Sequence, residues 1–164
     1  MKKVTRIVFA LFVVAASTAA LAQSSAQKSF EQLKSLAGAW EGKNSKGEAL
    51  QVSFKVTSNG SAVMSEIASH GDNMITMFNL DGPNKLVLTH YCSAGNQPRM
   101  QASTSADGKT VTFDFMDATN LASPDAGHMR GVAIAMLDGN HHTEVWTFDD
   151  HGKQMQEVFD LRRK

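Results

Sequence analysis

Residues 50–69 read LQVSFKVTSNGSAVMSEIAS, and this stretch decides the fold class. Apolar and polar residues alternate along residues 50–57, which is typical of a β-strand with one buried face. Residues 62–69 form a second short run, rich in apolar residues, that is also expected to be a strand. Ser58-Asn59-Gly60 separates the two runs and consists of residue types that favour tight turns. The stretch therefore predicts two antiparallel strands joined by a short turn.

The same pattern continues to the carboxyl terminus, whereas no segment after Leu36 sustains the period of a helix. Short joints rich in glycine, asparagine and aspartate separate the runs, so successive strands are expected to pair. One connection is longer: residues 119–128 contain Pro124 and Gly127 and are expected to form a loop or lid over one end. About ten strands are predicted, at residues 39–43, 50–57, 62–69, 74–80, 85–93, 98–105, 110–118, 129–137, 142–148 and 154–162.

A meander of this length exposes two edges unless it closes into a barrel. The sequence therefore predicts an all-β protein with a single antiparallel meander β-barrel at residues 30–164. An immunoglobulin-like sandwich is the alternative, but such sandwiches usually have longer crossover connections. Phe30, Leu33 and Leu36 have helical spacing and predict one short amino-terminal helix, with a flexible leader at residues 23–29 before it.

Residues 1–22 have the organisation of a secretory signal peptide. Basic residues at positions 2, 3 and 6 precede an apolar run, and Ala20-Leu21-Ala22 is a small-x-small cleavage site. The apolar run is shorter than the roughly 20 residues of a membrane span, and no cysteine follows the cleavage site to carry a lipid. The chain is therefore expected to be exported, periplasmic or secreted, with no membrane anchor.

Charge and cysteine content restrict the partners and the source of stability. The 164 residues include 16 basic and 16 acidic side chains, and removing residues 1–22 leaves 13 basic and 16 acidic ones, a formal charge of −3. Such a balance does not favour a nucleic-acid partner. Cys92 is the single cysteine, so no internal disulfide can form and core packing must hold the fold.

The segment at residues 36–42, LAGAWEG, follows the predicted helix and resembles the Gly-x-Trp signature that opens the first strand of calycins, the group of lipocalins, fatty-acid-binding proteins and nitrobindin-like barrels. The resemblance implies a lipocalin-like barrel in which Trp40 plugs the closed end and a basic residue of the last strand stacks on it. Arg162 or Arg163 stands at that place, and we take Arg162 as the expected partner. An arginine over an indole ring makes a cation–π contact.

Within this group the chain is more similar to nitrobindin-like barrels, because only the short turn at residues 44–48 separates the first two strands. That resemblance implies haem, held by a histidine near the carboxyl terminus. The last predicted strand, residues 154–162, contains no histidine, and the position has no clean match. Haem is therefore not the expected cofactor, although a histidine from another strand could supply an axial ligand.

The most informative candidate site begins at residues 86–92. Alternation places Leu86, Leu88, His90 and Cys92 on one face of a strand. If the two leucines point into the barrel, His90 and Cys92 are expected to point inward as well. The following turn carries Asn96, Gln97 and Arg99, which are expected at the same rim. These five polar residues are the predicted ligand-binding set, at residues 90, 92, 96, 97 and 99. The alternative is structural: turn residues that cap backbone groups and a core histidine with a partner.

We therefore predict a barrel that binds a small apolar or amphipathic molecule. Eight of the nine methionines follow residue 22, and methionine packs adaptably around irregular ligands. A second hypothesis is an isomerase or hydrolase that uses His90 as general acid or base, provided that Glu66 or Asp114 lies within reach. A third is a filled structural barrel. The sequence has none of the common hydrolase, phosphate-loop or metal motifs, so no catalytic or metal-binding residues are assigned.

Overall fold

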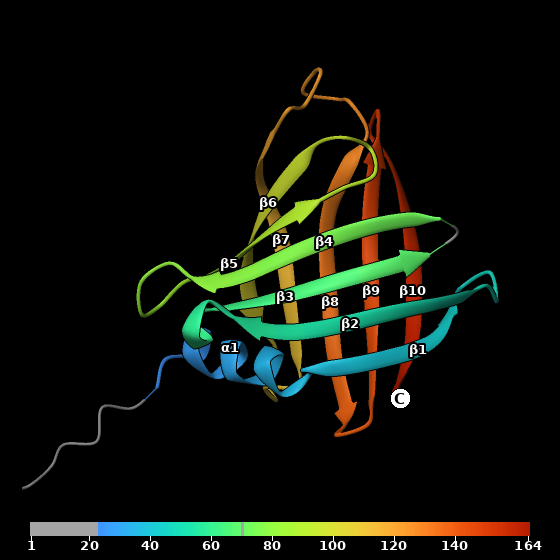
Figure 1. Ribbon diagram of the computed structural model, residues 1–164. Coiled ribbons are helices and arrows are strands. Elements are labelled where there is room, and N and C mark those ends of the chain that lie inside the picture. Colours follow the sequence, from blue (N-terminus) through green and yellow to red (C-terminus); the bar gives the residue numbers. More distant parts are fainter. Residues whose placement is uncertain (1–22, 70) are drawn as a thin grey trace, which may run out of the picture.

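The structure, a computed structural model, describes residues 23–69 and 71–164. The predicted signal peptide at residues 1–22 lies outside the described residues. The described chain forms one short helix and a closed barrel of ten antiparallel strands, each paired with its neighbours in sequence, with β1 paired to β10 (Figure 1). The predicted all-β meander barrel is confirmed. No helix in this part of the chain is long and apolar enough to cross a bilayer.

The strands follow the predicted order with small differences at their ends. A single 3₁₀ turn, η1 at Ser58–Gly60, connects the second and third strands. Asn59 within it has a φ of 54°, in the left-handed region that asparagine tolerates. The strands are β1 Gly38–Asn44, β2 Ala49–Thr57, β3 Ala62–Ser69, β4 Asp72–Leu80, β5 Leu86–Tyr91, β6 Gln97–Thr104, β7 Thr110–Thr119, β8 His128–Asp138, β9 His141–Asp150 and β10 Lys153–Arg163.

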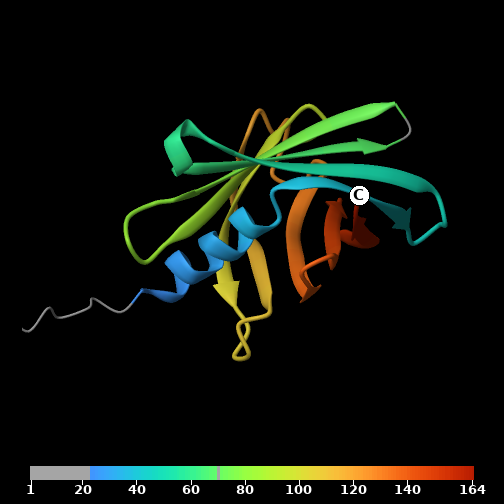
Figure 2. The ribbon, with the colours of Figure 1, turned by 60° about the horizontal axis from the view of Figure 1, so that its bottom comes forward.

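Helix α1, Ser25–Ser35, covers one end of the barrel and contacts β2, β4, β5 and β6 (Figure 2). Phe30 and Leu33 are buried, as their spacing indicates. The helix begins five residues earlier than expected, so most of the segment predicted as a flexible leader, residues 23–29, is helical instead. The reason is a capping box in which Ser24 and Gln27 bond each other's backbone amides.

The barrel is closed at the helix end by Trp40 and Arg163. The indole Nε1 donates to the Leu36 carbonyl at 2.7 Å, and the guanidinium carbon of Arg163 lies 4.3 Å from the indole centroid. Arg163 also donates to the carbonyls of Ser35, Ala37 and Gly139. The basic partner is therefore Arg163 and not Arg162, because β10 pairs with β1 in a register that sets Arg163 opposite Trp40.

Strand alternation directs one set of side chains into the barrel and the other to solvent. The hairpins β1–β2, β3–β4, β5–β6, β7–β8 and β9–β10 turn at the end opposite α1, which we call the mouth (Figure 1). The interior between mouth and helix is packed mostly with apolar side chains. The largest fully buried ones are Leu33, Trp40, Ile67, Phe78, Leu86, Leu88, Met100, Phe113, Ile134 and Leu161, together with two histidines, His90 and His142.

Candidate functional site

A cavity of about 530 Å³ opens at the mouth of the barrel. Its apolar wall comes from the inner faces of β4, β8, β9 and β10, as Met74, Met129, Phe148 and Phe159. The remaining lining residues are polar or small and lie at the rim: Lys46, Glu48, Ser69, Asp72, Cys92, Ser93, Ala94 and Glu157. The cavity thus has an apolar wall with a polar rim, which is the usual arrangement of small-molecule sites.

The turn between β1 and β2 fixes part of this rim. Asn44 is buried, and its Oδ1 accepts from the backbone amides of Lys46 and Glu48 at 3.0 and 2.9 Å. Its Nδ2 donates to carboxylate oxygens of Glu48 and Glu157, each at 2.7 Å. One asparagine therefore holds two carboxylates at the rim, and both belong to the cavity lining.

His90 lies inside the barrel, on the face that alternation predicts, and is fully buried. Its Nδ1 is 2.8 Å from the Thr76 hydroxyl, and its ring centroid is 4.8 Å from that of Trp146. Nε2 meets no hydrogen-bonding partner among the described residues. Burial lowers the pKa of His90 from 6.5 to about 4, so the ring is neutral at physiological pH.

The other predicted site residues do not gather around His90. Cys92 lines the mouth cavity, and burial raises the pKa of its thiol, which keeps it protonated at neutral pH. Asn96 is buried and donates to the Gly127 carbonyl at 2.8 Å. Gln97 accepts from the Thr119 hydroxyl. Arg99 is exposed on the outer wall and pairs with Asp117 through two hydrogen bonds of 2.5 Å. The single rim predicted from the sequence is thus divided between the mouth and the outer surface.

A buried polar network that the sequence reasoning missed lies on β9. Glu144 accepts from Trp146 Nε1 at 2.8 Å and from His142 Nε2 at 3.2 Å, and all three side chains are buried. The His142 ring meets Trp40 edge-on at 4.3 Å, which connects the network to the closed end. The signal was present in residues 142–148, HTEVWTF, where His142, Glu144 and Trp146 share one face.

The groups that would support catalysis by His90 lie elsewhere. Asp114 is exposed, and Glu66 accepts a hydrogen bond from Asn73 at 2.9 Å. Within the described residues, the side-chain hydrogen-bond partner of His90 is Thr76, which does not titrate. Those residues also contain no cluster of three or more histidine, cysteine, aspartate or glutamate side chains placed to hold a metal ion.

The structure gives haem no histidine at the place that the nitrobindin resemblance requires. β10 contains no histidine, and none lines the mouth cavity among the described residues. The buried histidines without a partner at one nitrogen are on β5, β8 and β9, as His90, His128 and His142. The residues present at the mouth therefore do not fit the histidine-ligated group of that resemblance.

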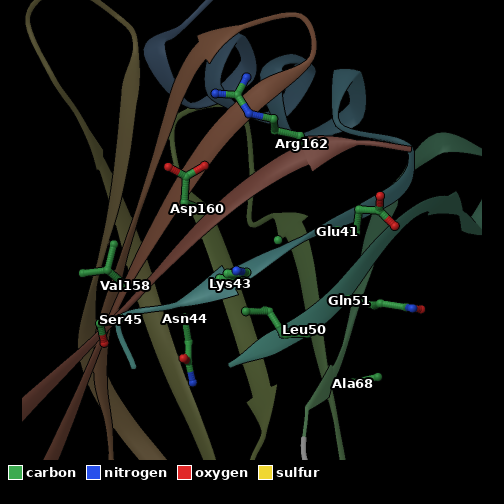
Figure 3. A pocket seen from close by; sticks show the side chains of 12 residues that line it. Glu41, Lys43, Asn44, Ser45, Leu50, Gln51, Ala68, Val158, Asp160 and Arg162 are labelled. Carbon is green, nitrogen blue, oxygen red and sulfur yellow. The ribbon is translucent and has the colours of Figure 1, made fainter. Parts of the chain in front are cut away.

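A larger hollow of about 890 Å³ lies on the outer wall, where β1, β2 and β10 meet (Figure 3). It is bordered by exposed charged side chains, including Glu41, Lys43, Asp160 and Arg162. The alternation that turns Arg163 toward Trp40 turns Arg162 into this groove. The groove is the more open of the two hollows, so a ligand in it would keep more of its surface in water than a ligand in the mouth. The mouth is therefore the better candidate despite its smaller volume.

Neither protein-family models nor curated proteins match the chain. Among solved structures, it is similar to Rv2717c from M. tuberculosis, with a TM-score of 0.59 and 14% identity over 83% of this chain and 97% of that one. It is also similar to a DUF3598-family protein of unknown function from Nostoc punctiforme PCC 73102, with a TM-score of 0.55 and 9% identity. That match covers 81% of this chain but only 49% of the other, about half its length. These likenesses and the closed ten-stranded antiparallel topology fit a calycin-like barrel fold.

Proposed function

We propose that this protein binds a small apolar or amphipathic molecule in the mouth of its barrel. The observation that carries the proposal is the cavity of about 530 Å³, which has an apolar wall on one side and a polar rim on the other. Met74 and Met129 give that wall a surface that adapts to irregular shapes, and Phe148 and Phe159 give it aromatic area. An apolar ligand body gains about 25 cal/mol for each Å² that it removes from water there.

The barrel supplies the rigidity that such a site needs. The apolar wall is formed by strands, which are less mobile than loops, and the closed sheet holds those strands in fixed register. Below the wall, His90 and Trp146 fill the interior, so a ligand would occupy the mouth and would not pass through the barrel. A binding role is favoured over catalysis because the described residues place no titratable partner within hydrogen-bond reach of His90.

The test uses diphenylhexatriene, a hydrocarbon dye that becomes fluorescent in apolar surroundings. We expect saturable binding to the native protein, and we expect Met74→Trp to weaken it at least about tenfold, because the larger ring fills the cavity. Met77→Trp is the matched control: it makes the same substitution on the same strand, with the side chain on the opposite face. Equal dye binding by both variants, or none by the native protein, would contradict the proposal.

Native mass spectrometry of protein purified gently from its own host complements the dye. A reproducible small-molecule adduct that is lost in Met74→Trp and kept in Met77→Trp would identify the class of the natural ligand. The same spectrum gives the mass of the polypeptide, and therefore reports whether residues 1–22 have been removed, as the expected export requires.

A further inference from the structure

Two buried hydrogen-bond acceptors lie behind the wall of the mouth without a donor. The first is Asn96 Oδ1, on a side chain that is 4% exposed. The Asn96 amide nitrogen donates to the Gly127 carbonyl at 2.8 Å. Because a carbonyl only accepts hydrogen bonds, this contact fixes which atom of the amide is nitrogen and leaves Oδ1 as the free acceptor. Within residues 23–69 and 71–164, nothing donates to that oxygen.

The second acceptor is His128 Nε2, whose ring is also 4% exposed. His128 Nδ1 lies 2.7 Å from the Ala126 carbonyl, so Nδ1 must carry the proton of that hydrogen bond. In the neutral imidazole the other nitrogen, Nε2, then presents a lone pair. The ring is held in place by Phe115, with centroids 4.6 Å apart, and the described part of the chain offers Nε2 no donor.

Neither Asn96 nor His128 lines the mouth cavity itself, but residues next to each of them do. Gly127, which accepts from Asn96, lies against the cavity residue Phe148: a Cβ atom on Gly127 would be 2.9 Å from Phe148 Cζ. Met129, the next residue after His128, lines the cavity. The Asn96 carbonyl accepts from the backbone amide of Cys92, which also lines it. The acceptors thus belong to the side of the mouth formed by the β5–β6 turn and the end of the β7–β8 loop.

A buried acceptor without a donor costs about 1–3 kcal/mol relative to one that is hydrogen-bonded. The two side chains that carry these atoms are held by the neighbouring carbonyls of Ala126 and Gly127. A ligand group that donates a hydrogen bond to either atom would therefore gain free energy. Charge at the mouth points the same way. Among the described residues, the charged side chains that line the cavity are the acidic Glu48, Asp72 and Glu157 and the basic Lys46. An anionic ligand would be repelled there and would bring no donor.

We propose that Asn96 and His128 recognise a hydrogen-bond donor at the polar end of the ligand, so that the mouth takes amphipathic amines and alcohols in preference to carboxylates. This inference rests on the proposed binding function and names its ligand class. The apolar body lies along Met74, Met129 and Phe159, and the amine or hydroxyl group displaces Phe148 slightly to reach the two acceptors.

The experiment compares three ligands with one alkyl body and different heads: octylamine has donors only, octanol has a donor and an acceptor, and octanoate has acceptors only. Each competes with diphenylhexatriene, which has no hydrogen-bonding atoms. We expect octylamine to bind at least about tenfold more tightly than octanoate, with octanol between them, which is the effect of one or two hydrogen bonds. Equal affinities, or a preference for octanoate, would overturn the inference.

Substitutions then assign the preference to the two acceptors. Asn96→Leu and His128→Phe each remove one acceptor at nearly constant side-chain volume. We expect each variant to lower the ratio of the octanoate dissociation constant to the octylamine dissociation constant severalfold. The dye should still bind to both variants. Asn79→Leu is the matched control, since exposed Asn79 on β4 also donates its amide to a backbone carbonyl. A ratio unchanged in both test variants would overturn the inference and leave the binding function intact, whereas absence of dye binding to the native protein would overturn both.

Discussion

His90 makes the stability of the barrel depend on pH. Its pKa is 6.5 in an unfolded chain and about 4 in the buried site. Between these values the unfolded chain holds a proton that the folded barrel does not, so the free energy of unfolding rises with pH across this window. Above pH 6.5 the free energy of unfolding has its full value with respect to this group. As the pH falls toward 4, it decreases by about 3 kcal/mol in total. Urea titrations at several pH values measure it.

The matched comparison is His90→Gln with His151→Gln. We expect the first variant to flatten the dependence between pH 4 and 6.5, and the second to leave it in place, because the exposed His151 has a pKa raised by Asp150 and acts with the opposite sign. The carboxyls with lowered pKa values, at Asp107, Asp117 and Asp125, change stability only below their ordinary value of 3.8. A dependence that survives in His90→Gln would mean that another buried group causes it.

The orientation of some side chains could be predicted from alternation within their own strand, whereas that of others depends on how neighbouring strands pair. His90 could be placed from its own strand, because Leu86 and Leu88 identify the buried face. The orientation of Arg99 could not be predicted in this way. Arg99 pairs with Thr89, whose side chain points away from the interior, and the register of β6 with β7 shifts between Arg99 and Met100. The same limit applies to the choice between Arg162 and Arg163, since only the pairing of β1 with β10 decides which arginine meets Trp40.

At the scale of elements, α1 depends on its amino-terminal cap. Ser24 Oγ accepts from Gln27 N at 3.1 Å, and Gln27 Oε1 accepts from Ser24 N at 2.8 Å. We expect Ser24→Ala to lower the free energy of unfolding by about 1 kcal/mol, whereas Ser25→Ala, one residue later and exposed, should be neutral or slightly stabilising. Chemical denaturation of both variants measures the difference. Equal stabilities would show that packing on the barrel alone holds the helix.

The strands were more predictable than the helix, for a physical reason. Each strand carries its own signal, because alternation and turn residues are local, and all ten appear in the predicted order. The start of α1 depended on the pair Ser24 and Gln27, which resembles an ordinary polar leader unless the reciprocal cap is recognised. The network of His142, Glu144 and Trp146 on β9 was readable in the same local way, but its partners come from other strands, such as Trp40.

For the molecule as a whole, the decisive feature is the seam where β1 meets β10, since this pairing turns a meander into a barrel without edges. Gly42 faces Leu161 there, and a Cβ atom at Gly42 would lie only 1.8 Å from the Asp160 carbonyl oxygen. The obstruction is backbone, so no side-chain rotation can relieve it. The seam therefore requires glycine at this position for close approach and not for its range of φ.

Gly42→Ala should accordingly open the seam. Overpacking in a core typically costs about 1–3 kcal/mol, and we expect the upper end of that range because the backbone itself must move. Gly139→Ala is the matched control, since a Cβ atom there meets nothing within 4 Å. Hydrogen exchange distinguishes a local opening from general destabilisation: amides of β1 and β10 should exchange faster in Gly42→Ala, while those of β5 and β6, on another part of the barrel, should change less. Uniform acceleration in all four strands would mean that the barrel opens as one unit, and unchanged exchange at the seam would mean that β10 can shift to admit a methyl group.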